Sequence, residues 1–101
     1  MKIFIDNDNK VKLNGLHFDD EENYINNASV KVQIINNQTD STIFEQFMSY
    51  VSNSDGNYEL IIPNDVELET KYYIIKIIAN TVDKKATWEE SVEAVKRNFN
   101  N

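Results

Sequence analysis

The segment Ala28-Ser29-Val30-Lys31-Val32-Gln33-Ile34-Ile35 decides the fold class of this chain. Apolar side chains occupy positions 28, 30, 32 and 34, and polar side chains occupy the positions between them. A period of two predicts a β-strand that buries one face and exposes the other. This is the cleanest alternation in the chain, and β structure also dominates the segments on either side of it.

Towards the C-terminus, the turn cluster at 53–57 gives the strongest turn signal. It contains Asp55-Gly56, and an Asp-Gly pair tolerates the positive φ that a tight hairpin requires. The alternating segment 58–62 follows and predicts a strand that Pro63 ends, because proline cannot donate to a ladder. Between these elements, segment 43–51 fits a helix nearly as well as a strand. Its content of β-forming residues favours a strand.

Two further segments read as strands. Segment 72–82 is rich in Ile and Tyr on both faces, which predicts a central strand that is covered on both sides. Near the N-terminus, the short apolar segment 3–5 is followed by alternation over 11–18. That alternation slips once at Asn14-Gly15, and a slip at glycine predicts a β-bulge.

Segment 86–99 supports two interpretations. Its apolar residues Trp88, Val92, Val95 and Phe99 have helical spacing, and the charges at its two ends complement a helix dipole. The period-two alternation over 92–97 and the short link after segment 72–82 instead favour a closing β-hairpin. The local pattern indicates a helix, whereas the need of the other strands for an edge partner favours a strand.

We therefore expect one all-β domain spanning residues 1–101, a β-sandwich of six to seven strands. The alternative is an α+β sandwich with a C-terminal helix. The length of 101 residues, with 41% hydrophobic and 27% charged residues, suits one soluble core. Charged residues on the strands, such as Lys31, Glu45 and Glu59, are expected to discourage edge-to-edge association.

Composition excludes several classes of chemistry. Cysteine is absent and His17 is the single histidine, so thiolate sites and multi-histidine metal sites are ruled out. The net charge of −7 argues against direct nucleic-acid binding, which needs clustered Lys and Arg. No signal peptide or membrane-spanning segment is expected, and no cofactor is implied.

Candidate chemical sites are weak. Asp6, Asp8 and Asn9, or the charge run 19–22, could offer oxygen ligands to Ca²⁺, but a solvated turn is the simpler interpretation. No serine has the sequence context of a nucleophile activated by His17, which we expect to be a solvent-facing strand residue. Glu67 and Glu69 flank Leu68 in a loop and are interpreted as surface charge. The chain is therefore expected not to be an enzyme, with no catalytic or metal-binding residue assigned.

Trp88 is the one candidate interface residue. Most of the eleven aromatic residues are expected inside the core, because a sandwich of this size needs large side chains there. Trp88 is followed by Glu89 and Glu90, which indicates a partly exposed position. Tryptophan is enriched at the centres of protein interfaces.

The order of these segments resembles small immunoglobulin-like proteins encoded among the capsid and tail genes of tailed bacteriophages. The resemblance covers nearly the whole chain, and the segments that carry it are these: 11–13, 16–19, 28–32, Ser54-Asp55-Gly56-Asn57-Tyr58-Glu59-Leu60 with Pro63, 72–75, Trp88-Glu89-Glu90 and Val95-Lys96-Arg97. It implies that the domain is an immunoglobulin-like β-sandwich of six to seven strands. It also implies a non-enzymatic virion component, made in the host cytoplasm, that docks on capsid, neck or tail proteins. Two alternatives remain: an acidic inhibitor that binds a nucleic-acid-binding host protein, and an immunoglobulin-like surface or carbohydrate-binding module.

Overall fold

A computed structural model describes residues 1–18 and 23–99 of the chain, and within them it contains only strands and connections. The strands are β1 (Lys2–Ile5), β2 (Asn9–Leu13), β3 (Ser29–Asn36), β4 (Thr42–Phe47), β5 (Ser49–Tyr50), β6 (Tyr58–Ile62), β7 (Tyr72–Asn80) and β8 (Lys85–Lys96). The all-β class is therefore confirmed. Across the described residues, no helix is long and apolar enough to cross a membrane.

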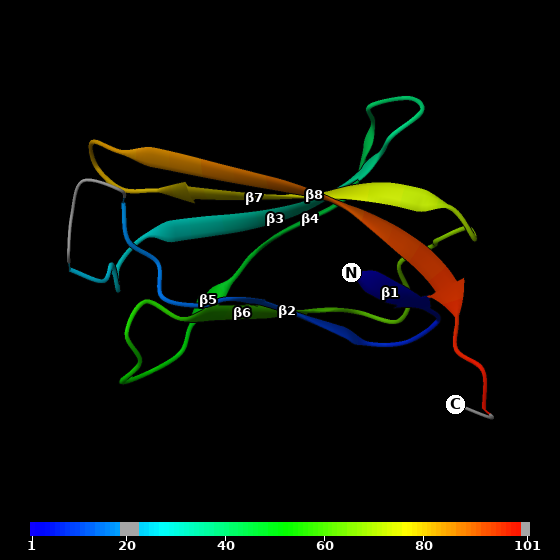
Figure 1. Cartoon of the computed structure of the whole chain (residues 1–101), viewed down its shortest axis with the longest axis horizontal. Helices are drawn as coiled ribbons and strands as arrows, with labels where there is room; N and C mark the ends of the chain where they lie inside the picture. The colour runs from blue at the N-terminus through cyan, green and yellow to red at the C-terminus, as the bar shows by residue number, and fades with distance from the viewer. Residues whose placement is uncertain (19–22, 100–101) are drawn as a thin grey trace.

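The strands form two layers. The larger sheet has the order β1-β8-β7-β3-β4, and the smaller sheet has the order β2-β6-β5. Every pair is antiparallel except β1 with β8, which run parallel. Figure 1 shows the two layers facing each other, and the larger sheet curls at the end of β8, where β8 lies beside β1. This arrangement is a β-sandwich with one strongly curled sheet.

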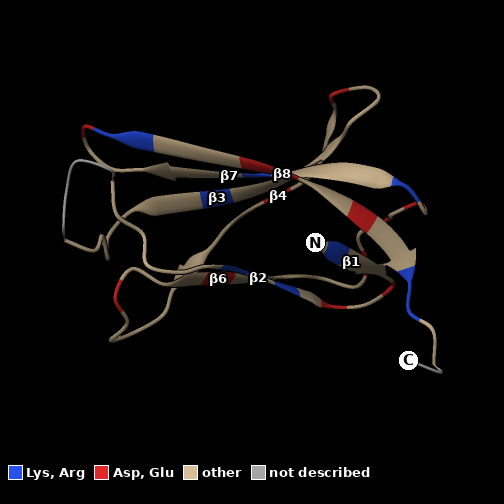
Figure 2. Ribbon diagram, in the orientation of Figure 1, with Lys and Arg blue, Asp and Glu red and all other residues tan. Residues whose placement is uncertain are grey.

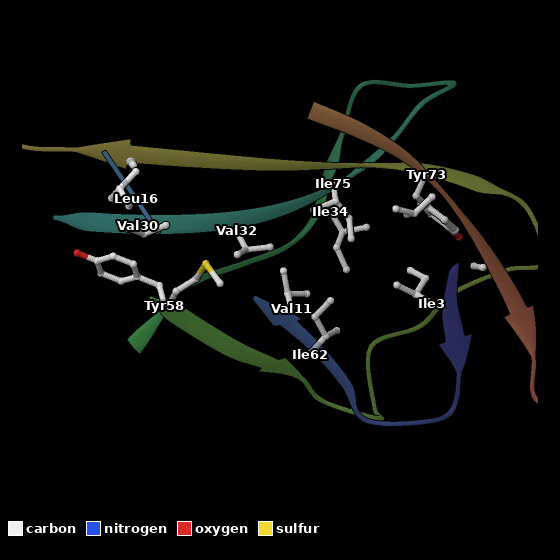
Figure 3. Close-up of a cluster of buried hydrophobic side chains, with 14 of the residues drawn as sticks. Ile3, Val11, Leu16, Val30, Val32, Ile34, Tyr58, Ile62, Tyr73 and Ile75 are labelled. Atoms are coloured by element: carbon white, nitrogen blue, oxygen red, sulfur yellow. The ribbon is translucent and has the colours of Figure 1, made fainter. Parts of the chain in front are cut away.

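The core lies between the layers, as the alternation along the strands requires. Val30, Val32 and Ile34 of β3 are fully buried and point towards the smaller sheet (Figure 3). Val11 and Ile62 of the smaller sheet are buried in the same cluster. Burying one such side chain stabilises a fold by about 1.5–3 kcal/mol. The segment with the cleanest alternation in the sequence thus forms the centre of the core.

Tyr58 ties a connection to this core. Its ring is 1% exposed, and its hydroxyl donates to the carbonyl of Ile25 at 2.8 Å and accepts from the N–H of Ala28 at 3.1 Å. These two bonds hold the chain just before β3. Burial raises the pKa of Tyr58 above its ordinary value of 10.0, and the hydrogen bond from Ala28 opposes part of that shift.

This raised pKa predicts a loss of stability in alkaline solution. The neutral phenol is favoured in the folded state, so its contribution is complete below pH 10 and declines as the pH rises through the raised pKa. The free energy of unfolding should fall by at most about 1.4 kcal/mol per pH unit from this group. Denaturant titrations from pH 9 to 12 measure it. Tyr58→Phe should show a shallower decline, and equal slopes in the two proteins would contradict the prediction.

Segment 43–51 is extended, as predicted, but it forms one strand in each of the two sheets. It divides at the buried residue Met48, so that β4 pairs with β3 and β5 pairs with β6. The N–H of Met48 bonds to the carbonyl of Val30 at 2.7 Å, and the chain crosses between the layers there. This division gives eight strands rather than six to seven.

The β-bulge predicted at Asn14-Gly15 is wrong, because β2 ends at Leu13. Gly15 has a φ of 68° and turns the chain out of the sheet. Leu16 then donates its N–H to the carbonyl of Gly56 at 2.8 Å. Residues 16–18 therefore form an irregular segment that is anchored to the turn before β6. His17 consequently lies in a connection and not in a strand.

The positive φ predicted for the turn before β6 is found at Gly56, with a φ of 70°. The connection from β5 to β6 spans residues 51–57, so it is longer than the tight hairpin that the Asp-Gly pair suggested. Tyr50 donates its hydroxyl to the carbonyl of Ser54 inside this connection. The loop is therefore held by its own side chains.

Strand β7 is central, as predicted, but it is covered on one face only. Tyr73, Ile75 and Ala79 are buried against the smaller sheet, whereas Tyr72 at one end of the other face is 54% exposed. No second layer of described residues covers that outer face. The expectation of a doubly covered strand is therefore wrong, since apolar content alone does not tell which faces other elements will cover.

A row of polar side chains crosses the outer face instead. Lys76 lies 3.6 Å from Glu89, and Lys31 lies 3.5 Å from Glu45. The amide of Gln33 donates to Glu45 at 2.6 Å. That bond, together with the nearby Lys31 ammonium, lowers the pKa of the Glu45 carboxyl below its usual range. Charge pairs across strands stabilise a solvent-facing sheet surface by small amounts.

Segment 86–99 is a strand over most of its length. Strand β8 pairs with β7 from Lys85 to Glu93 and with β1 from Glu93 to Lys96. The helical alternative for this segment is wrong, and so is the α+β fold class. The residues at helical spacing do not share one buried face, because Val92 is fully buried and Phe99 is 95% exposed. Pairing with β7 outweighs a local preference for helix.

Candidate protein-binding surface at the open edge of strand β8

The first half of β8 is an open sheet edge. Strand β1 pairs with β8 only from Glu93 onwards. From Lys85 to Ser91, β8 has β7 on one side and no strand on its other side among residues 1–18 and 23–99. In Figure 1 this stretch forms the upper rim of the sandwich, ahead of the point where β8 bends towards β1. An open edge presents unpaired backbone donors and acceptors to any extended chain.

The backbone groups that face outwards can be identified from the bonds at the two ends of the β7–β8 pair. Lys84 accepts from the N–H of Thr81 at 2.8 Å, and Ala94 donates to the carbonyl of Lys71 at 2.9 Å. Even-numbered residues of β8 therefore direct their backbone groups towards β7. The pairing register is continuous, so odd-numbered residues direct theirs outwards. At Glu93 this outward N–H bonds to the carbonyl of Met1 at 3.3 Å.

Trp88 stands on the inner side of this edge. It pairs with Ile77 of β7, and the residue is 39% exposed. A groove of about 320 Å³ opens beside the indole ring. The groove is lined by Met1, Val11, Lys12, Ile75, Ile77, Trp88, Glu89 and Glu90. The sequence-based expectation that Trp88 is partly exposed is confirmed by this position.

Two glutamates on the rim of the groove carry ion pairs. The N-terminal ammonium of Met1 lies 3.6 Å from Glu90, and Lys76 lies 3.6 Å from Glu89. Both carboxylates are more than half exposed. Exposed pairs of this kind contribute little to folding, so these glutamates can exchange partners at low cost.

The core accounts for fewer aromatic residues than expected. Phe18, Tyr58 and Tyr73 are buried, whereas five others are exposed: Tyr24, Phe47, Tyr72, Trp88 and Phe99. The other three, Phe4, Phe44 and Tyr50, are half-buried, so the prediction that most aromatics are internal holds only in part. Aliphatic residues fill the centre of the sandwich, since the many isoleucines and valines of the strands are enough to cover the smaller sheet.

The first candidate calcium site is used for structure. The side-chain oxygen of Asn9 accepts from the N–H of Phe4 at 2.8 Å, and its amide donates to the carbonyls of Phe4 and Asn7. Asp8 accepts from both the backbone and the side chain of Asn64. These bonds join β1, β2 and the end of β6. The second candidate, 19–22, lies outside the described residues.

His17 and the two loop glutamates also have local roles. The ring of His17 is exposed, and its Nδ1 donates to the carbonyl of Gly15 at 3.0 Å. Glu67 and Glu69 line a hollow of about 410 Å³, where Lys71 lies 3.7 Å from Glu69. Tyr73 also lines this hollow, but it is 3% exposed and its hydroxyl accepts from the backbone N–H of Glu69. Its ring is therefore not a platform for a sugar.

The described carboxylates are distributed over the whole molecule. Figure 2 shows acidic positions in loops at both ends of the sandwich and on strands of both sheets, interspersed with lysines. Within residues 1–18 and 23–99 they form no group with a geometry suited to hold a metal ion. The open edge of β8 instead combines unpaired backbone groups with the groove beside Trp88.

Sequence reasoning identified Trp88 but missed the backbone beside it. Edge position depends on where β1 begins to pair, and nothing local in segment 85–91 encodes that. Comparison of the chain with protein families, curated proteins and solved structures gave no match. The surface must therefore be interpreted from its own chemistry.

Proposed function

We propose that this chain is a non-enzymatic immunoglobulin-like module of a tailed-phage particle, which works by docking on other protein chains. The observation that carries the proposal is the open edge of β8 beside the half-exposed Trp88. A strand edge supplies main-chain hydrogen bonds, and an adjacent aromatic groove supplies apolar contact area. Such a surface suits the burial of a partner protein rather than the turnover of a substrate.

The strand order supports the immunoglobulin-like part of the proposal. In that fold one sheet is built on strands C, F and G, and the other on B, E and D. Here β3, β7 and β8 take the places of C, F and G, while β2, β6 and β5 take those of B, E and D. Tyr73 adds support, because its hydroxyl accepts from the backbone of Glu69 at 2.8 Å, four residues earlier. A tyrosine bonded in this way at the start of strand F is typical of the fold.

The phage setting is supported by the sequence resemblance, and the charge distribution favours docking over mimicry. A decoy of nucleic acid needs carboxylates gathered on one face at phosphate-like spacing. The described carboxylates are instead spread over both ends and both sheets (Figure 2). An acidic inhibitor therefore has less support than a structural module.

Association with particles tests the proposal. Particles are purified from the phage or host that encodes the chain, and their proteins are quantified by mass spectrometry. We expect the chain at a fixed ratio to capsid or tail proteins. Trp88→Ala should lower its occupancy, since truncating a central tryptophan costs an interface about 2 kcal/mol or more. Tyr72→Ala is the matched control, because Tyr72 is 54% exposed on the opposite face of the sheet.

A protein that is expressed but absent from the particles would overturn the structural role. Equal loss of occupancy in the Trp88 and Tyr72 variants would keep the docking role but move its surface away from β8. Circular dichroism of both variants verifies that they fold.

A further inference from the structure

We infer that the partner of the β8 edge is a second copy of this chain, whose own β8 edge pairs antiparallel with it about a two-fold axis at Thr87. This inference rests on the proposed function and refines it: the protein chain that covers the β8 edge is a second copy, and the chain joins a particle as this dimer. Its basis is the order of side chains along the edge, Lys85-Ala86-Thr87-Trp88-Glu89, which is complementary to its own reverse.

Antiparallel pairing centred on Thr87 satisfies the charges. Each residue then faces the residue of the second copy that lies equally far from Thr87 in the opposite direction. Lys85 therefore faces Glu89 of the second copy, and Glu89 faces its Lys85. Both residues are exposed and lie on the outer face of the sheet. Glu89 would lie between Lys76 of its own chain and Lys85 of the other. Opposite charges that face each other across a strand pair are favourable, and two such pairs form here by symmetry.

The same register fits the apolar side of the edge. Ala86 faces Trp88 of the second copy, so a small side chain lies opposite a large one on the inner face. The two Trp88 rings become diagonal neighbours, about 7–8 Å apart at their Cβ atoms, which is within reach for aromatic side chains. Each ring thereby loses part of the 39% exposure that Trp88 has in the single chain.

The backbone pattern also agrees with this register. Lys85, Thr87 and Glu89 are odd-numbered and direct their N–H and C=O groups outwards. The two Thr87 residues can therefore exchange a pair of hydrogen bonds across the axis. Position 91 would face position 83, which lies in the β7–β8 turn of the second copy. The paired segment thus ends before it reaches Met1.

The sequence suggested that the net charge and the solvent-facing charges on the strands would discourage edge-to-edge association. The strand charges named for it, Lys31, Glu45 and Glu59, have partners within their own chain: Lys31 pairs with Glu45, and Lys10 pairs with Glu59. On β8 the charges are arranged with opposite signs at equal distances from Thr87. This arrangement of charges favours pairing between two β8 edges and does not oppose it.

A cysteine at the axis tests the register directly. The chain has no cysteine, so Thr87→Cys carries a single thiol that can bond only to another copy. Facing residues in a hydrogen-bonded pair have Cα atoms about 5.5 Å apart, inside the range of about 4.4–6.8 Å that a disulfide spans. We expect mild oxidation to link Thr87→Cys completely. Thr42→Cys is the matched control, because Thr42 is also exposed on an edge strand and should stay largely unlinked.

Charge reversal tests the same contact without a new bond. The measurement is the mass in solution over a concentration series, where the native chain should approach twice 11.8 kDa. Lys85→Glu and Glu89→Lys should each raise the dimer dissociation constant about tenfold, since each turns two attractive pairs into repulsive ones. The double variant should recover dimerisation because the pairs reform with their signs exchanged. Lys31→Glu makes the same change in net charge as Lys85→Glu, but on strand β3 and away from the β8 edge, so it should leave the constant unchanged.

Trp88 provides an independent signal, because it is the chain's single tryptophan. Its emission should shift to longer wavelength as the native protein is diluted and the dimer dissociates. A chain that stays monomeric over the concentration series, or a Thr87→Cys variant that links no faster than Thr42→Cys, would overturn the inference. If the chain is monomeric but is found on particles, the inference fails and the proposed function stands. If the chain is dimeric but is absent from particles, the proposed function fails and the dimer stands.

Discussion

Tyr58→Ala is expected to destabilise the protein by about 3–5 kcal/mol, which is the usual cost of truncating a fully buried aromatic residue. Tyr58 is 1% exposed and begins β6, the middle strand of the smaller sheet, with the ring of Tyr50 against it at 5.6 Å between centroids. The substitution opens a cavity and also removes the hydroxyl that holds Ile25 and Ala28. A domain of this size has about 5–15 kcal/mol of stability in total, so the loss is a large share.

Denaturant unfolding, followed by circular dichroism, measures this effect. Tyr58→Phe keeps the ring and removes only the two hydrogen bonds, so it should cost about 1–3 kcal/mol. Tyr72→Ala removes a tyrosine of the neighbouring sheet that is 54% exposed, and it should cost far less. If Tyr58→Ala were no more harmful than Tyr72→Ala, Tyr58 would not be the anchor that its burial and hydrogen bonds indicate.

Gly56→Ala is expected to cost about 2–4 kcal/mol, because it combines backbone strain with a steric clash. Gly56 has a φ of 70°, a conformation that side chains other than glycine rarely adopt. A Cβ atom there would lie 2.6 Å from the backbone nitrogen of Leu16 and 2.8 Å from its oxygen. Backbone atoms cannot move aside as the end of a flexible side chain can, so the hydrogen bond from Leu16 to Gly56 would be disrupted.

Gly15→Ala is the matched control for that substitution. Gly15 has nearly the same φ, 68°, but its added Cβ would meet only the side chain of Tyr24 at 3.4 Å. It should therefore show the strain alone, about 1–2 kcal/mol. Thermal unfolding of the two variants separates the clash from the strain. Equal losses would mean that residues 16–18 are not held against the turn at Gly56.

Several elements were predictable because their signal is local. A strand that buries one face must alternate, and the segments 28–35 and 58–62 do so. Both became strands whose buried residues are the predicted ones, with Val30, Val32, Ile34, Tyr58 and Ile62 in the core. The positive φ at Gly56 was predictable for the same reason, since glycine in a turn cluster is a property of the turn itself.

Elements that depend on distant partners were predicted less well. Segment 86–99 carries both a helical spacing and an alternation, and only pairing with β7 decides between them. Segment 43–51 looks continuous, yet it divides at Met48 because the two halves find different neighbours. Segment 14–18 alternates like a strand, yet Leu16 bonds to Gly56 instead of to a ladder.

The candidate surface shows the same division. The sequence alone predicted an all-β chain, a segment 86–99 that is compatible with a strand, and a partly exposed Trp88. It also contains the order of charges from Lys85 to Glu89. Only the tertiary structure determined that β1 joins β8 at Glu93, which leaves the preceding backbone open. Side-chain periodicity reports which face of a strand is buried, and it carries no information about which strand lies beside it. The availability of an edge is therefore a property of the assembled sheet.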